Sequence, residues 1–303
     1  MALNSFLDYL TPTQRIAATA VLLLVGVVIA FLRLGREPTP SPAPRPGDAP
    51  QTLANRNIRF GMPADAKHDP ASKDAYLMDR PQFVLSYNDS TRNPNWVCWS
   101  LNAADIGNAT RTAFKSDPDL PKEFYHVRND DFVGTGFDKG HMCASKDRSA
   151  SDPDNDITFY LTNVVPQSPN NNQKGWRLLE ERCRDLAKQG KELHIACGPH
   201  GQGGTGQIGK DEAKRLTIGK TQPIVVPESV WKVVLVLPGK DAVPDAQSQA
   251  FAVWMPNDQT VGTDWKKYSV SVATVEQRTG YRFFPLVPDA VANPIKSRAD
   301  HTP

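Results

Sequence analysis

The sequence lacks the features that mark several common protein classes. Its 303 residues carry a formal net charge of only +2 and include just four cysteines. No segment repeats at a solenoid period, which excludes a repeat array. The cysteine spacing fits no zinc site. No Gly-Lys-Ser/Thr follows the glycine-rich segment 198–209, so a mobile surface loop is favoured there over a phosphate-binding loop.

The few cysteines leave two alternatives open. An even number permits two disulfides in an exported chain, and Cys183 and Cys197 are candidates for a pair. Buried free thiols are the other interpretation, and it is favoured for any particular pair. The four residues are Cys98, Cys143, Cys183 and Cys197.

Long apolar runs are also scarce, since only one stands out. Residues 16–32 read IAATAVLLLVGVVIAFL between Arg15 and Arg33. This length is near the lower limit of roughly 17–25 residues for a helix that spans a bilayer. We predict a membrane anchor over 16–34, after a short N-terminal segment, 1–15. A cleaved signal peptide is the alternative, although no small-x-small cleavage site follows the run.

The remaining chain divides by composition. Residues 37–50 read EPTPSPAPRPGDAP, which favours an extended spacer, predicted over 35–70. A folded domain is expected over 71–289, because 39% hydrophobic residues suffice for a sizeable core. Residues 290–303 are expected to form a polar tail.

Periodicity within the domain predicts an α+β fold with a mixed or antiparallel central sheet. Two strands, 83–87 and 96–101, flank an Asn-Asp-Ser turn. A helix is expected over 173–188, because apolar residues recur there every three or four positions before Gly190. A second helix is expected to begin at Ser271 and to end at Gly280. Further strands are expected at 159–165, 193–196, 224–226, 230–237 and 250–255.

The segment 137–180 carries the residues that indicate chemistry. His141 lies in FDKGHM, which we interpret as a tight turn made possible by Gly140. Asparagines follow at 163 and 170–172, and Glu180 lies on the predicted helix. A neutral imidazole accepts a proton near neutral pH. Amide oxygens are hard ligands for Mg²⁺, which keeps most of its waters. A base, a hydrated cation and flanking positive charges suit hydrolysis of a phosphodiester.

These residues resemble the DNA/RNA non-specific endonuclease family of the ββα-metal nucleases, the endonuclease G-like group. The family signature is Asp-Arg-Gly-His, then Asn-x-x-Pro-Gln, then Asn-Gln followed after six residues by Glu, with an internal Trp. It matches DKGH at 138–141, NVVPQ at 163–167 and NQKGWRLLE at 172–180. The resemblance extends roughly over 83–288 and includes FKSDP at 114–118 and TGYRFFPL at 279–286. It implies a ββα-metal (His-Me finger) catalytic unit lying across the sheet.

Residue chemistry and resemblance together assign the candidate site. His141 is the predicted general base, with a structural histidine as the alternative. Asn172 is the predicted ligand of Mg²⁺, with Mn²⁺ as a possible substitute. Glu180 is expected to orient metal-bound water, with a solvated helix glutamate as the alternative and Glu181 as its competitor. Asn163 is expected either to position the phosphate or to brace the histidine loop.

Two cations complete the predicted site. Lys139 stands where the family has arginine, and a lysine cannot hold a phosphate through two parallel hydrogen bonds. We expect Lys139 to neutralise charge at phosphorus, with a lower rate or a changed substrate pose. Arg111 is the nearest candidate for the family's upstream phosphate-binding arginine. Asp138 is expected to brace the loop and not to bind metal.

Because net charge is small, the basic surface of a nucleic-acid-binding protein must be local here. Candidates cluster around the motif, although a solvated helix face is the alternative for those on the helix. No recognition helix, zinc finger or aromatic RNA-binding signature is present, so we expect phosphate contacts to DNA and RNA without sequence preference. These candidates are Lys139, Lys146, Arg148, Lys174, Arg177, Arg182 and Arg184.

Two other functions remain as alternatives: a phosphodiesterase acting on small nucleotides, and a catalytically impaired nucleic-acid-binding protein at the cell surface.

The charge pattern and the expected function favour opposite locations for the domain. Arg33 and Arg36 follow the apolar run, and the positive-inside rule alone would keep the domain in the cytoplasm. A non-specific nuclease would threaten the cell's own nucleic acid there, so we expect an extracytoplasmic domain, secreted if the segment is cleaved. Nothing in the sequence indicates an oligomeric state.

Overall fold

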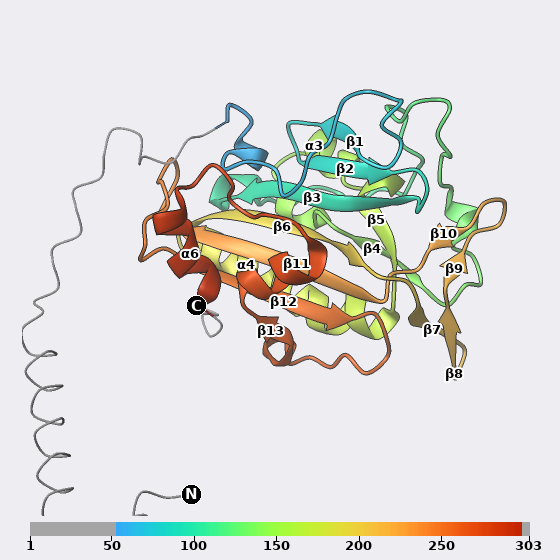
Figure 1. Cartoon of the computed structure of the whole chain (residues 1–303). Coiled ribbons are helices and arrows are strands. Elements are labelled where there is room, and N and C mark those ends of the chain that lie inside the picture. Colours follow the sequence, from blue (N-terminus) through green and yellow to red (C-terminus); the bar gives the residue numbers. More distant parts are fainter. Residues whose placement is uncertain (1–52, 299–303) are drawn as a thin grey trace, which may run out of the picture. The chain divides into compact units, whose positions relative to one another are not determined.

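A seven-stranded antiparallel sheet forms the centre of the folded domain (Figure 1). The structure is a computed structural model and describes residues 53–298. Every neighbouring pair of strands in this sheet is antiparallel, as the predicted fold class allows. In spatial order the strands are β1 (Tyr76–Asp79), β2 (Val84–Asn88), β3 (Asn93–Leu101), β6 (Glu192–His200), β11 (Ser229–Leu237), β12 (Gln249–Pro256) and β13 (Ser269–Val270).

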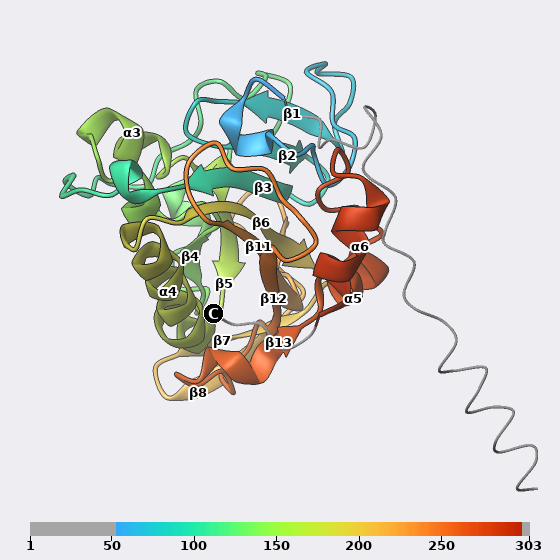
Figure 2. The same ribbon diagram turned by 90° about the vertical axis from the view of Figure 1, so that its left-hand side faces the viewer.

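Both faces of the sheet carry a buried core. Successive residues of its central strands point to opposite faces and therefore contribute to the two cores in turn. In β11, Val230 and Val234 join the core under α4 (Arg177–Lys188), whereas Trp231 and Val233 join the core on the other face. That second core also contains residues of α5 (Val272–Thr279) and α6 (Asp289–Ser297). Figure 2 shows α4 on one side of the sheet and α5 and α6 on the other. α4 therefore lies on the sheet as one layer of the molecule.

Two short strands and α4 form the ββα unit. β4 (Asp138–His141) pairs antiparallel with β5 (Val164–Gln167), so that His141 lies opposite Val164. A π-helical turn, η6 (Asn171–Trp176), leads directly into α4. The helix predicted over 173–188 is therefore present, with its apolar positions in the core.

The strand predicted over 159–165 is wrong for its first five residues, 159–163. Residues 161–163 form a 3₁₀ turn, η5 (Leu161–Asn163), and β5 starts only at Val164. The segment 159–165 is rich in apolar residues because it is buried, and not because all of it is extended. The prediction at the other helix holds: Ser271 caps α5 by accepting from the Thr274 N–H, and Gly280 ends it at φ 73°.

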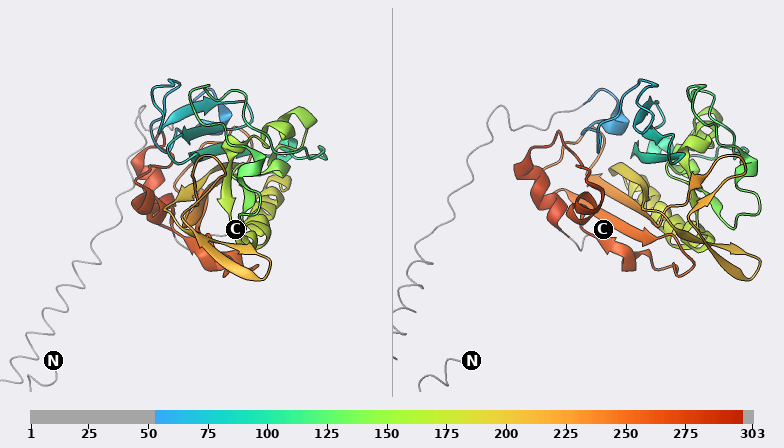
Figure 3. Two further views of the ribbon diagram at one scale, coloured as in Figure 1. Left: turned by 90° about the vertical axis from the view of Figure 1, so that its right-hand side faces the viewer. Right: turned by 45° about the vertical axis from the view of Figure 1, so that its right-hand side comes forward.

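The glycine-rich segment forms a hairpin instead of the predicted mobile loop. β7 (Gly204–Ile208) pairs with β8 (Asp211–Arg215). Backbone hydrogen bonds tie it to the body, from Thr205 to Asn257 at 2.9 Å and from Gln207 to Gly136 at 2.8 Å. The right-hand view of Figure 3 shows it at the opposite end of the molecule from α6. The other elements are α3 (Asp152–Ile157), β9 (Thr217–Ile218), β10 (Ile224–Val225), and 3₁₀ turns at Arg56–Ile58, Ala103–Asp105, Asn129–Asp131, Ser145–Arg148 and Trp265–Tyr268.

The packed domain extends beyond the predicted limits at both ends. Ile58 and Phe60, assigned to the spacer, are buried in the core beside α5 and α6. Residues 289–297, mostly assigned to the polar tail, form α6, whose Ile295 is buried. Composition misplaced these boundaries because a few apolar side chains suffice to dock a polar segment.

The predicted membrane anchor at 16–34 lies outside the described residues. Within 53–298, no helix has the length and apolar character to cross a membrane.

The cysteines are free and buried, which is the favoured alternative. Cys183 and Cys197 both lie in the core under α4, without a disulfide. Burial raises the pKa of the Cys183 thiol to about 12. A thiol in that state is no nucleophile.

Candidate active site

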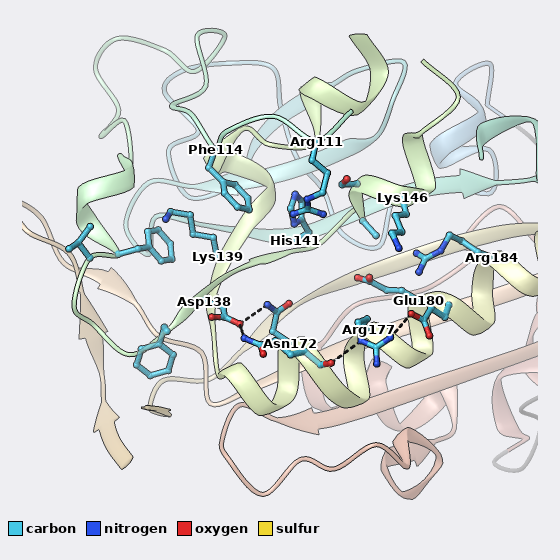
Figure 4. A pocket seen from close by; sticks show the side chains of 17 residues that line it. Arg111, Phe114, Asp138, Lys139, His141, Lys146, Asn172, Arg177, Glu180 and Arg184 are labelled. Atoms are coloured by element: carbon cyan, nitrogen blue, oxygen red, sulfur yellow. Dashed lines mark hydrogen bonds and ion pairs between the residues drawn. The ribbon is translucent and has the colours of Figure 1, made fainter. Parts of the chain in front are cut away.

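A cavity of about 780 Å³ lies above β4 and the first turns of α4 (Figure 4). Five of the six predicted site residues line it, and Asn163 does not. Residues far apart in the sequence meet here because β4, η6 and α4 are successive parts of one unit. Its lining residues are Arg111, Phe114, Phe132, Val133, Phe137, Asp138, Lys139, His141, Ala144, Ser145, Lys146, Asn172, Gln173, Arg177, Glu180, Glu181 and Arg184.

His141 lies at the end of a strand and not in the predicted tight turn. β5 holds the segment extended through the pairing of Gly140 with Val165. Gly140 is needed for space: a Cβ at this position would lie 2.0 Å from Oε1 of Gln167. The glycine thus permits a close approach of two strands rather than a sharp turn.

The imidazole of His141 packs against two aromatic rings. The ring centres of Phe114 and Phe159 lie 4.8 and 4.9 Å away. Nε2 is buried and has no hydrogen-bond partner among the described residues. Burial, and secondarily the charge of Arg111, lowers the pKa of His141 to about 3. The ring is therefore neutral at physiological pH, and an anionic phosphate in the cavity would raise its pKa and strengthen it as a base.

Asn172 has its amide oriented by a carboxylate. Its Nδ2 donates to Oδ2 of Asp138 at 2.8 Å, and Nε2 of Gln173 donates to the same oxygen at 2.8 Å (Figure 4). The side-chain oxygen of Asn172, Oδ1, accepts no hydrogen bond within 53–298 and remains available to a ligand. Asp138 thus holds two side chains of η6, whereas its predicted role was to brace the loop of His141.

The donor set suits a cation that keeps most of its own waters. No group of three or more His, Cys, Asp or Glu side chains that could hold a metal occurs within 53–298. A single amide oxygen beside a half-buried carboxylate is a poor site for zinc but an acceptable one for Mg²⁺, which binds few protein ligands. The residues present therefore fit a hydrated Mg²⁺ better than a fully coordinated metal.

Glu180 points from α4 toward the cavity (Figure 4). Its side chain is 14% exposed, and burial raises its pKa to about 7, an effect that Lys232 opposes. Glu181, its predicted competitor, also lines the cavity but forms an ion pair with Arg177. The two glutamates are therefore distinguished by their partners, since Glu180 faces a buried cation and Glu181 an exposed one.

Asn163 braces the histidine loop, which was one of its two predicted roles. The side chain is fully buried. Its Nδ2 donates to the carbonyls of Cys143 and Thr158, both at 2.9 Å, and its Oδ1 accepts from the Cys143 N–H at 2.9 Å. With its amide satisfied by backbone groups away from the cavity, Asn163 is not placed to contact a phosphate. The alternative prediction was therefore wrong.

Cations lie on the rim of the cavity. The Lys139 ammonium lies 5.6 Å from the ring centre of Phe114 and 5.3 Å from that of Phe132, and burial lowers its pKa. The exposed Arg111 lies over Phe159 at 5.0 Å. Arg148, also predicted in this cluster, is buried elsewhere and donates to the carbonyl of Ser100 at 2.8 Å. The predicted cluster is thus only partly a surface feature.

Sequence reasoning missed one charged residue close to the site. Lys232 lies in the middle of β11, and its Nζ is 3.9 Å from Oε1 of Glu180. The signal was present, because a lysine interrupts the apolar run SVWKVVLVL, whose nine residues are all buried. A lysine is almost never fully buried unless it is paired.

Known proteins resemble this chain over most of its length. The sequence profile of the family described as DNA/RNA non-specific endonuclease matches residues 61–290. A nuclease of Nostoc sp. is 38% identical over 250 residues, which make up 81% of this chain and 86% of that protein. The mitochondrial nuclease EXOG of Danio rerio is 31% identical over 237 residues, covering 76% of this chain and 64% of that protein.

A solved structure shares the fold. The crystal structure of an EndoG/EndoGI complex superposes with a TM-score of 0.63 at 24% identity, over 77% of this chain and 91% of that chain. This likeness confirms the predicted fold class, an α+β domain with a ββα-metal unit on an antiparallel sheet.

Proposed function

The chain belongs to the DNA/RNA non-specific endonuclease family and is a nucleic-acid-hydrolysing enzyme, and from this premise we propose that it is a Mg²⁺-dependent endonuclease acting on DNA and RNA with little sequence preference. One observation carries the proposal. A half-buried neutral histidine, an oriented amide oxygen and several cations meet in one cavity. This combination suits phosphodiester hydrolysis, which needs a proton acceptor and compensation of negative charge.

The shape of the site favours a polynucleotide over a small nucleotide. A second hollow of about 490 Å³ adjoins the cavity and shares five of its lining residues. It continues toward Asn108 and Lys188. Cations along such a groove bind phosphates regardless of sequence. The shared residues are Arg111, Ser145, Lys146, Glu181 and Arg184.

His141 is proposed to take the proton from the attacking water, because its ring is neutral and its Nε2 has no competing partner. Asn172 would hold Mg²⁺, or Mn²⁺ in its place, through its carbonyl oxygen. The ion, when bound, would supply Lewis-acid stabilisation of the leaving oxygen. Glu180 is proposed to orient water at that position from the helix side. Lys139 and Arg111 would stabilise negative charge on the phosphate.

The alternative of a silenced binding protein is less well supported. The base, the amide oxygen and Glu180 all line one cavity. A protein that only binds nucleic acid has no use for an orphaned imidazole nitrogen in an apolar setting, which costs free energy. The arrangement therefore favours an active enzyme.

Plasmid cleavage tests the function. The full chain should nick and then linearise supercoiled DNA and degrade unstructured RNA in Mg²⁺, and chelation with EDTA should stop both reactions. Cleavage products should map throughout the substrate. Activity on p-nitrophenyl esters of nucleotides alone, with intact plasmid, would instead support a small-nucleotide phosphodiesterase.

Lys139→Ala should lower kcat by an amount equivalent to about 2–4 kcal/mol of transition-state stabilisation, because it removes one preorganised cation. KM should change little if the charge acts mainly in the transition state. Lys139→Arg should keep or raise kcat, since a guanidinium can hold two phosphate oxygens. Steady-state kinetics on a defined duplex would measure kcat and KM for both variants. If the alanine variant cuts like wild type, Arg111 or Lys146 becomes the better candidate for this charge.

We also propose an extracytoplasmic domain tethered by the N-terminal segment. Removing residues 1–50 should yield a soluble, fully active nuclease, because the first core residue within 53–298 is Ile58. The full chain should stay in the membrane fraction, and protease added to the extracytoplasmic side should digest the domain. Protection of the domain from that protease would favour the cytoplasmic placement given by the charge bias.

A further inference from the structure

Lys232 is a buried cation directly behind the cavity. Its side chain is 1% exposed and points from β11 to the face of the sheet that carries α4, as do Val230 and Val234. Its Nζ lies 4.2 Å from the ring centre of Trp176 and 5.4 Å from that of Trp99. An ammonium removed from water is unfavourable unless nearby groups compensate its charge. Two indole faces do so only in part.

The carboxylate that compensates Lys232 is Glu180. Within 53–298, Lys232 forms one ion pair, in which its Nζ lies 3.9 Å from Oε1 of Glu180. This distance is too long for a hydrogen bond, so charge and not a directional bond couples the two groups. Since Glu180 lines the cavity and Lys232 belongs to the central sheet, the lysine reaches the site from behind.

The other charges near Glu180 do not replace that lysine. Arg184, one turn further along α4, donates to Oδ1 of Asp147 at 2.9 Å. The second oxygen of Asp147 accepts from Nε1 of Trp99 at 3.0 Å. Arg184 and Asp147 therefore largely compensate each other, and Glu181 adds further negative charge beside Glu180. Burial alone favours the uncharged acid of Glu180, and Lys232 opposes this.

We propose that Lys232 is a positioning residue, whose ammonium holds the Glu180 carboxylate and its negative charge at the cavity wall. Lys232 acts through Glu180 and does not touch the substrate. The proposal rests on the proposed function, because it presumes that Glu180 takes part in the reaction. It also explains why a strand that is otherwise apolar and buried carries a lysine at its centre.

Lys232→Met tests this role, because methionine removes the charge but is only one atom shorter and can keep the apolar contacts with the two tryptophans. It should lower kcat at pH 7 roughly 10–100-fold, as for groups that act behind a reacting residue, and leave KM for DNA within about twofold. Val234→Ala is the matched control, since Val234 lies on the same face of β11 and carries no charge. It should lower the unfolding midpoint but leave kcat near wild type.

A double-mutant cycle with Glu180→Gln separates positioning from packing. In the Glu180→Gln background, Lys232→Met should cause no further loss of kcat, because its target is already neutral. An equal loss in both backgrounds, or a single variant that cuts like wild type, would overturn the proposal.

Urea unfolding of the wild type, the two single variants and the double variant measures the coupling between Lys232 and Glu180 without any cleavage assay. Lys232→Met should destabilise the chain with Glu180 present and much less with Glu180→Gln, because only the first leaves a buried charge unpaired. If the wild-type chain cuts nothing, the proposed function fails, yet this coupling is still measured. If Lys232→Met prevents folding in both backgrounds, or destabilises both equally, the lysine is structural and the positioning role is wrong.

Discussion

His141→Ala should reduce DNA and RNA cleavage by about 10²–10⁴-fold, which is the usual contribution of a general base. The reason is geometric as well as chemical. Nε2 is buried without a partner inside the cavity, and the neutral ring is the form that accepts a proton. Single-turnover cleavage of a labelled duplex would measure the loss, and DNA binding in EDTA should be nearly unchanged.

The matched control is His126→Ala. His126 lies outside the cavity, with Nε2 3.2 Å from the carbonyl of Pro121, and its removal should leave cleavage within about twofold of wild type. Because His141 packs against Phe114 and Phe159, circular dichroism and thermal unfolding must show that the variant is folded. A folded His141→Ala protein with activity within a few-fold of wild type would remove His141 from the mechanism.

Asn172→Ala should weaken metal binding and rate together, because it deletes the amide oxygen that Asp138 orients. Lewis-acid stabilisation is worth several kcal/mol, so the loss at limiting Mg²⁺ is expected on the order of 10²–10³-fold. Excess Mg²⁺ or Mn²⁺ should restore part of the activity. Calorimetric titration of the metal into the protein without substrate gives a second readout.

Asn170→Ala serves as the control for this variant. Asn170 lies in the same segment but donates to the carbonyl of Gln259 at 2.6 Å and does not line the cavity. It should titrate metal as wild type does. If Asn172→Ala also does so, the ligand lies elsewhere, with Glu180 and Asp138 as the next candidates.

Elements that depend on neighbouring residues were predicted correctly, whereas an element that depends on a distant contact was not. The helix that carries Glu180 and the caps at Ser271 and Gly280 were predicted because periodicity and capping are properties of a few neighbouring residues. The extended β4, predicted as a turn, depends on Gln167, twenty-seven positions after Gly140, packing where a Cβ would stand. Sequence patterns around Gly140 alone do not contain that contact.

The sequence by itself determined the family, the order of the motifs and which residue types are available for chemistry. Only the tertiary structure decided where each of them lies and what it contacts. It turned the amide of Asn163 inward to the backbone and that of Asn172 toward the cavity, although both are asparagines of the same motif series. It also brought Lys232 behind Glu180 across fifty-two positions of chain. Burial and charge at a site depend on distances in space, and a sequence specifies those distances only through the complete fold.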